Sequence, residues 1–358
     1  MTPFRREITA LRLSSQRISS PGDLRTPLDV ARWMLALQSQ DLPGARWSLG
    51  LRLPGSTDAD IGLALATGAI VRSWPMRGTL HIVAPEDLGW MLDIAARRQA
   101  TWAAKRRADL EISDEQLARA GDIAAELMAG GTAVRRDALL AAWESRGIPT
   151  TGQRGYHLLW NLGHAKVVVF GPPDAKQPTF ALFDEWVGQG RALEGDEALA
   201  ELAARYVRSH GPATERDFAW WASITLGDAR KGVAAADGLE LRDFGGVAHY
   251  LAPGLEPAAS GVFALPGFDE YMLGYQDRSP ALAAEFAPRI VPGNNGMFLP
   301  TVVVDGEVVG TWKRTDGAKR ITVDLAEFTS LTKKARAGFE RALTRYGAFV
   351  GKPVQLRE

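Results

Sequence analysis

The sequence predicts an α+β protein with three tandem winged-helix units, followed by a C-terminal β-barrel-like domain with a late helix. Two patterns predict this class. Three successive segments each contain helical runs that end in a short pair of strands, and the tail changes to short apolar runs separated by turn residues. The 358 residues also exceed one ordinary compact core. We place the domains at residues 1–109, 110–194, 195–258 and 259–358.

The first segment opens with a predicted helix over residues 28–40. It is expected to stop ahead of Pro43, because the residue before a proline is disfavoured in helical geometry. A second helical run covers 58–67. Residues 69–74 and 79–83 then predict two strands around a Pro-Met-Arg-Gly turn, which is a hairpin in the position of a wing.

The second and third segments repeat this plan. Thr214, followed by acidic residues, is a strong helix start, because free backbone amides at a helix N-terminus favour such partners. The second segment predicts helices at 114–128, 135–145 and 155–162 and strands at 166–170 and 179–183. The third predicts helices at 196–209, 214–221 and 226–236 and strands at 239–244 and 248–252.

The tail contains short apolar runs separated by glycine and aspartate. Asp305-Gly306, between two such runs, is a typical hairpin turn. The late helix is expected over 330–346, with Gly347 ending its last turn, and the extreme C-terminus is a candidate for one further strand.

Composition narrows the function classes. Hydrophobic residues make up 46% and charged residues 23%, as in soluble globular proteins, and no apolar run is long enough for a transmembrane helix or shaped like a signal peptide. There is no cysteine, and the five histidines lack metal-ligand spacing. We therefore expect a cytoplasmic protein without metal or cofactor.

The charges cancel overall, at 42 basic against 42 acidic residues, but not locally. Residues 1–109 carry a balance of +5 and residues 259–358 one of +2, whereas the two middle segments are acidic. If the two ends meet in space they could form a basic cleft, because attraction to phosphate depends on the local field.

Several stretches carry a family resemblance. They are LALQSQDLPGARWSLGLR (35–52), VRSWPMRGTLHIV (71–83), HGPATERDFAWWASI (210–224), LPGFDEYMLGYQDRSPAL (265–282) and NNGMFLPTVVVDGEVVGTWKR (294–314). In this order they resemble the winged-helix DNA glycosylase superfamily of the AlkZ/YcaQ type, over nearly the whole chain. The resemblance implies a Gln-x-Gln motif, here Gln38-Ser39-Gln40, with Gln38 and Gln40 as the catalytic pair.

Two glutamines suit the hydrolysis of a glycosidic bond whose leaving base already carries positive charge. An amide can orient water but does not titrate near neutrality, so it is a poor general base. A purine alkylated at N7 or N3 already carries positive charge, and its bond to the sugar breaks with little acid assistance. Geometry adds a condition: residues two apart on a helix point roughly 200° from each other, so the helix should be ending at this motif.

Other residues are weaker candidates. Asp41 is a candidate electrostatic support for the sugar cation, or else a polar residue at a helix end. His81 is a second candidate support, or else a hydrogen-bonded interior histidine. The resemblance and a polar helix face suggest DNA contacts, with a turn or solvated surface as the alternative, for Arg72, Arg77, Arg154, His157, Asn161, Lys313 and Arg314.

The acids of the 268–278 segment could indicate a glycoside hydrolase, but the resemblance favours a structural role for Asp269 and Glu270.

The sequence thus predicts a monomeric, monofunctional DNA glycosylase that acts on alkylated purines in double-stranded DNA and leaves an abasic site. Interstrand crosslinks are a further candidate substrate, because shallow access between winged helices suits bulky lesions. The main alternative is a non-catalytic winged-helix regulator, although three unlike units fit a symmetric dimer poorly. A scaffold that binds lesions without cutting is the third possibility.

Overall fold

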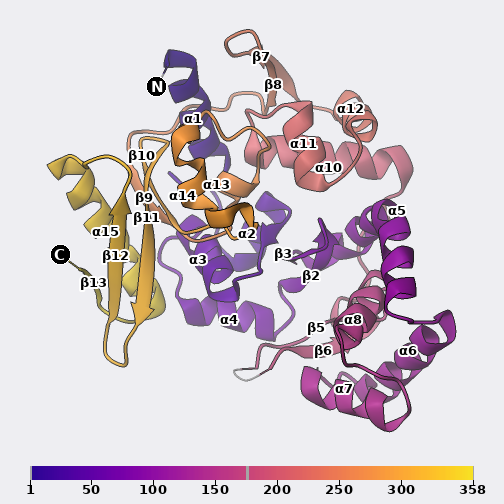
Figure 1. Ribbon diagram of the computed structural model, residues 1–358. Helices are drawn as coiled ribbons and strands as arrows, with labels where there is room; N and C mark the ends of the chain where they lie inside the picture. Colours follow the sequence, from indigo (N-terminus) through magenta and orange to yellow (C-terminus); the bar gives the residue numbers. More distant parts are fainter. Residues whose placement is uncertain (1, 175–176, 358) are drawn as a thin grey trace. The chain divides into compact units, whose positions relative to one another are not determined.

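The computed structural model describes residues 2–174 and 177–357 and confirms the α+β class. It divides into two compact units, one of residues 1–61 with 195–358 (unit 1) and one of residues 62–194 (unit 2). Unit 1 therefore contains the indigo N-terminal segment and the orange and yellow C-terminal part of the ribbon in Figure 1. The four predicted domains are a finer division, and they stay a prediction.

Unit 1 begins with helices that lead to the Gln-x-Gln motif. These elements are α1 (Pro3–Ser15), α2 (Pro27–Met34), β1 (Leu37–Gln38), α3 (Leu42–Arg52) and α4 (Asp58–Ala66), which continues into unit 2. A capping box formed by Thr26 and Asp29 starts α2. The prediction that this helix reaches residue 40 is wrong. It ends at Met34 because Leu35 adopts φ 63°, which no right-handed helix accommodates, and the buried run that follows is extended.

The third helical segment also lies in unit 1. It contains α10 (Gly195–His210), α11 (Glu215–Ala222), α12 (Leu226–Ala235) and the hairpin β7 (Glu240–Asp243) with β8 (Ala248–Leu251). The predicted start at Thr214 is confirmed, because its hydroxyl accepts the Asp217 N–H and the Asp217 carboxylate accepts the Thr214 N–H. The order of helices and hairpin is that of a winged helix.

The C-terminal part of unit 1 is the predicted β-rich domain. Its five strands lie in the order β13-β12-β11-β10-β9, and the hairpin turn at Asp305-Gly306 joins β10 to β11. Four short helices lie between the first two strands of this sheet along the chain. The elements are β9 (Val262–Leu265), α13 (Glu270–Leu273), η1 (Ala284–Phe286), α14 (Ala287–Ile290), η2 (Pro292–Asn294), β10 (Thr301–Val304), β11 (Glu307–Asp316), β12 (Ile321–Glu327) and β13 (Val354–Leu356).

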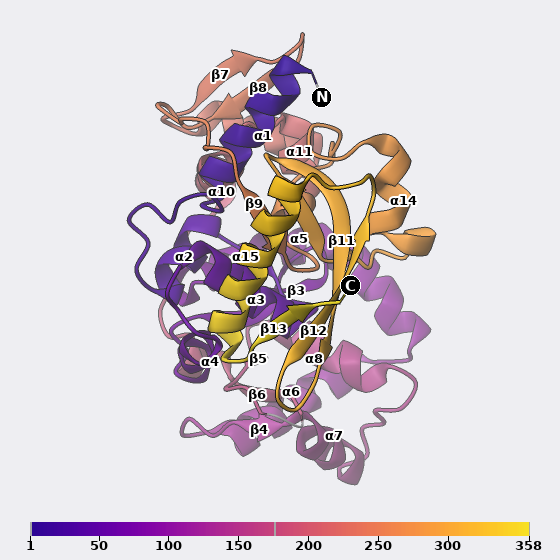
Figure 2. The ribbon, with the colours of Figure 1, turned by 90° about the vertical axis from the view of Figure 1, so that its left-hand side faces the viewer.

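The late helix α15 (Lys333–Val350) packs along this sheet, as Figure 2 shows. The prediction that Gly347 ends it is wrong. Gly347 is a buried helical residue where a Cβ would lie 2.8 Å from the Lys352 carbonyl oxygen, so glycine serves a close approach there. The left-handed Gly351 is the actual C-cap, and the expected last strand is confirmed as β13, parallel to β12.

Unit 2 contains the hairpin predicted as the first wing and the segment predicted as the second winged helix. The hairpins β2–β3 and β5–β6 join through β2 and β5 into the strand order β3-β2-β5-β6-β4, a shared sheet that the sequence did not predict. Trp74, Trp143 and Phe180 lie in its core. The elements are β2 (Val71–Met76), β3 (Thr79–Val83), α5 (Pro85–Asp109), α6 (Asp114–Met128), β4 (Val134–Arg135), α7 (Arg136–Ser145), α8 (Arg154–His164), β5 (Val168–Phe170), β6 (Thr179–Leu182) and α9 (Phe183–Trp186).

Candidate active site

The two glutamines lie on non-helical chain between α2 and α3. Gln38 ends β1, Ser39 is wholly buried, and Gln40 is exposed just before α3 begins at Leu42. Ser39 and Gln40 lie beyond β1, with Gln40 in a bend, so helical periodicity does not turn the two side chains in opposite directions. The early end of α2 therefore removes the geometric conflict that a continuous helix would impose on the pair. Gln38 keeps 9% of its surface exposed.

Asp41 lies at the start of a helix and not at the end of one. It is the exposed N-cap residue of α3, although its side chain makes no capping hydrogen bond. Its carboxylate stays beside the first turn, since a Cβ on Gly44 would lie 2.6 Å from Asp41 Oδ2. A negative charge is favourable at this end of a helix. The alternative interpretation of Asp41, as a polar residue at a helix C-terminus, is therefore wrong.

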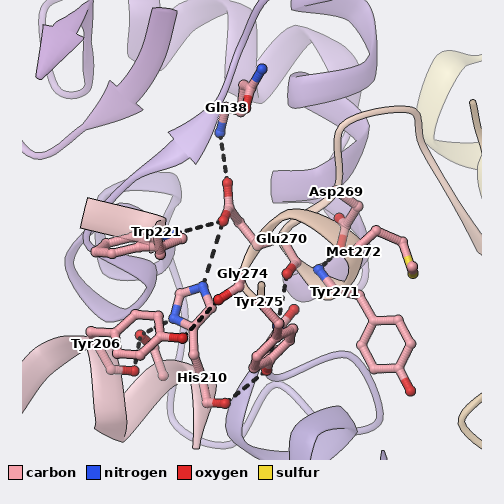
Figure 3. Close-up of polar contacts among 12 residues, drawn as sticks. Gln38, Tyr206, His210, Trp221, Asp269, Glu270, Tyr271, Met272, Gly274 and Tyr275 are labelled. Atoms are coloured by element: carbon pink, nitrogen blue, oxygen red, sulfur yellow. Dashed lines mark hydrogen bonds and ion pairs between the residues drawn. The ribbon is translucent and has the colours of Figure 1, made fainter. Parts of the chain in front are cut away.

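The backbone of the motif is attached to a buried carboxylate. Glu270, the first residue of α13, accepts the Gln38 N–H at Oε1 over 3.1 Å and the Trp221 Nε1–H at Oε2 over 2.9 Å. Figure 3 shows the Gln38 side chain extending away from this carboxylate. Glu270 is 1% exposed. It therefore supports the motif through the main chain and leaves the amide side chain for other contacts.

Asp269, the neighbouring acid, belongs to a buried ion pair. Its oxygens accept from Arg52 Nη1 and Nη2 at 2.8 and 3.0 Å, from Ser48 Oγ at 2.6 Å and from the Tyr271 N–H at 2.9 Å. Arg52 also donates to the side-chain oxygen of Gln16, whose amide nitrogen donates to the Glu270 carbonyl. Helices α1 and α3 are thereby joined to α13, in agreement with the structural role expected for this segment.

His210 lies beside Glu270 in the same interior. Its Nε2 is 3.6 Å from Glu270 Oε2, which is beyond hydrogen-bond range, and its Nδ1 is 2.9 Å from Ser209 Oγ. Burial lowers the pKa of His210, although the carboxylate opposes that shift. Burial likewise raises the pKa values of Tyr206 and Tyr275 well above the usual range. These groups are therefore neutral at pH 7.

The wing residues belong to unit 2. Arg77 Nη2 is 3.1 Å from His81 Nε2, and His81 Nδ1 is 2.9 Å from the Thr79 carbonyl oxygen. These partners assign the proton to Nδ1, so His81 is a neutral acceptor toward Arg77. Arg72 lies 5.0 Å from the Phe170 ring centre, and burial lowers its pKa to about 10. His81 is thus a hydrogen-bonded interior histidine here, and its support of catalysis stays a prediction.

Comparison with known proteins decides the family. The model of the family described as DNA glycosylase AlkZ-like matches residues 31–349. The chain belongs to the AlkZ-like DNA glycosylase family. It is 25% identical, over 87% of its length and 88% of the relative, to an interstrand DNA cross-link repair glycosylase of Streptomyces sahachiroi. The solved structure of the DNA glycosylase AlkZ of that organism matches with a TM-score of 0.82 at 24% identity, covering both chains completely.

The polar face of α8 contacts the protein itself. Arg154 donates to the Glu111 carbonyl and to Gln116 Oε1, both at 3.0 Å, and Asn161 donates to the His157 carbonyl at 2.7 Å. His157 Nε2 accepts from Arg106 Nε at 3.3 Å. DNA binding by Arg154, His157 and Asn161 stays a prediction, and it would require these contacts to be exchanged.

The two basic residues on β11 differ in exposure. Lys313 is exposed, whereas Arg314 donates to the Tyr346 hydroxyl at 2.7 Å and lies 3.7 Å from Asp316. Lys313 is thus the more accessible of the two for phosphate, and DNA binding by both residues stays a prediction.

Within residues 2–174 and 177–357 no cluster of three His, Asp or Glu could hold a metal ion, and no helix is long and apolar enough to span a bilayer.

Sequence reasoning missed the contact of Glu270 with Gln38. The available signal was local: two acids between Phe268 and the apolar end of α13 indicate buried carboxylates, and a buried carboxylate needs donors. The identity of the donors was not accessible, because they lie 232 and 49 residues away in the chain.

Proposed function

We propose that this member of the AlkZ-like DNA glycosylase family hydrolyses the N-glycosidic bond of purines alkylated at N7 or N3. It would act on double-stranded DNA as a monofunctional enzyme and leave an abasic site in an intact backbone. The observation that carries the proposal is the non-helical Gln38–Gln40 segment, anchored at the Gln38 N–H, which frees the two amides from the opposite directions that a continuous helix would impose.

The reaction follows from the charge of the leaving group. The bond between C1′ and the ring nitrogen breaks, its electron pair neutralises the cationic base, and the sugar becomes oxocarbenium-like. Gln38 and Gln40 orient a water whose oxygen bonds to C1′ and whose proton passes to solvent. Positioning replaces strong base catalysis in this scheme. The exposed carboxylate of Asp41 supplies negative potential beside the motif.

Crosslinked purines are a second proposed substrate. The support is the name of the Streptomyces sahachiroi relative, an interstrand DNA cross-link repair glycosylase. In such a lesion the alkyl group also joins a base of the opposite strand, but the purine is again alkylated at a ring nitrogen, so the same bond to C1′ would be cut. We propose that Arg72, Arg77 and Lys313 contact the phosphate backbone of the duplex. In this proposal the protein acts as a monomer, and it works in the cytoplasm on the nucleoid.

The test is base release from a duplex with one N7-methylguanine, measured under single turnover. Gln38→Ala and Gln40→Ala should each lower the rate about 100-fold, the scale of a mispositioned reactant, with DNA affinity within twofold of wild type. Gln189→Ala is the matched control, because Gln189 is exposed in the loop between α9 and α10. Strand breaks should appear only after alkali, as expected without lyase chemistry.

A duplex with a purine-to-purine interstrand crosslink forms the second arm. Conversion to two separable strands by wild type, but not by Gln38→Ala, supports unhooking. Tight binding without release from either duplex would contradict the proposed enzyme activity on these lesions and favour the lesion-binding alternative.

A further inference from the structure

Glu270 combines a costly position with a contact to the catalytic motif. The residue is 1% exposed, and a buried carboxylate is unfavourable unless donors compensate it. Its two oxygens accept from two different N–H groups, those of Gln38 and Trp221. An ionised carboxylate accepts at both oxygens and so satisfies both donors.

The surroundings of Glu270 leave the hydrogen bond to Gln38 strong. His210 Nε2 is 3.6 Å from Glu270 Oε2, within ion-pair range but beyond hydrogen-bond range, and burial lowers the pKa of His210. The Arg52 guanidinium donates to Asp269 instead. Hydrogen bonds to an ionised acceptor are roughly twice as strong as neutral ones. The main-chain N–H of Gln38 is therefore one of the groups that hold this carboxylate.

The segment that receives this hydrogen bond has little regular structure of its own. β1 is two residues long, and the chain between it and α3 is neither strand nor helix. The Gln38 amide is fixed from the C-terminal domain, across 232 residues of sequence. A shift of about 1 Å in a reacting group can cost 100-fold in rate, so an anchor at this point bears directly on hydrolysis.

We propose that Glu270 is a positioning residue for base excision: it holds the main chain at Gln38 so that the Gln38 amide stays oriented toward the attacking water. Trp221 fixes the second carboxylate oxygen and so sets the direction of the first. This proposal rests on the proposed function. It differs from a purely structural role in one respect, because loss of Glu270 should act through Gln38 and not through folding or DNA affinity.

The first experiment is a double-mutant cycle under single turnover on the N7-methylguanine duplex. Glu270→Gln should lower the rate at least 10-fold, because its amide offers one acceptor to two donors, with DNA affinity within twofold of wild type. The rate of Glu270→Gln with Gln38→Ala should match that of Gln38→Ala alone. Multiplied losses would overturn the proposal. Glu270→Asp covers the case in which Glu270→Gln does not fold, because it keeps the charge but is too short to reach Gln38. Full activity of Glu270→Asp would also overturn the proposal.

The second experiment does not depend on activity. Amide hydrogen exchange of the peptide covering residues 36–41 should accelerate at least 10-fold in the Glu270 variants. Exchange in unit 2 should stay unchanged. Unaltered exchange at 36–41 would refute the anchor even if the rate falls. If wild type releases no base, the proposed function fails, and hydrogen exchange still decides whether Glu270 fixes this segment.

Discussion

The buried pair of Arg52 and Asp269 allows a quantitative test of how unit 1 is held together. Asp269→Asn removes the negative charge from a guanidinium that is 0% exposed. Breaking one side of a buried pair costs about 3–5 kcal/mol, because the remaining charge stays desolvated. With an unfolding entropy of about 2.1 cal/mol/K per residue over about 225 residues of unit 1, the melting temperature should fall by about 6–11 °C.

Differential scanning calorimetry is the suitable assay, because two units need not unfold in one transition. Arg230→Gln is the matched control. It breaks a pair of unit 1 with a similar distance, 3.0 Å to Glu215, but Arg230 is 61% exposed, so the expected loss is about 0–1 kcal/mol. Melting of Asp269→Asn within 2 °C of wild type would refute the reasoning, since Arg52 would then be compensated by other groups.

Two further predictions concern pH and packing. Burial lowers the pKa of four histidines, so the unfolded chain binds more protons than the folded chain below about pH 6.5. The free energy of unfolding should therefore be highest above that pH and fall toward pH 5. Melting temperature against pH measures this, and a flat profile would contradict it. The four histidines are His157, His164, His210 and His249. Gly274→Ala would place a Cβ 2.6 Å from both the Glu270 carbonyl oxygen and His210 Cδ2. It should destabilise unit 1 by about 1–3 kcal/mol in urea unfolding, whereas an unchanged midpoint would show that α13 can shift freely.

The sequence predicted most elements of the fold, because their signals are local. The cap at Thr214, the hairpin turn at Asp305-Gly306 and the last strand all follow from neighbouring residues. Two helix ends were wrong for physical reasons that are not local. Apolar spacing through residue 37 suits a helix and a buried extended run equally well, and the glycine at 347 serves a close approach within the helix.

The candidate site was predictable only in part. Gln38 and Gln40 follow from the family resemblance, and their orientation conflict could be recognised from helical geometry alone. The resolution of that conflict depends on Leu35, whose left-handed conformation has no signal in its sequence neighbours. Glu270 was expected to have a structural role but not to be the partner of Gln38, because pairing across 232 residues is a property of the folded chain.

Because Glu270 lies on α13 and holds Gln38 on β1, its effect on stability can be separated from its effect on activity. Replacing a buried charge by an apolar side chain is often neutral or stabilising in other proteins, so stability alone does not require a carboxylate at residue 270. Here such a change would leave the N–H groups of Gln38 and Trp221 without this acceptor, and only the first belongs to the Gln-x-Gln motif. Trp221→Phe removes the second donor and keeps the first. If Glu270 serves the reaction, base release should fall less in Trp221→Phe than in Glu270→Gln, even where the two proteins melt at the same temperature.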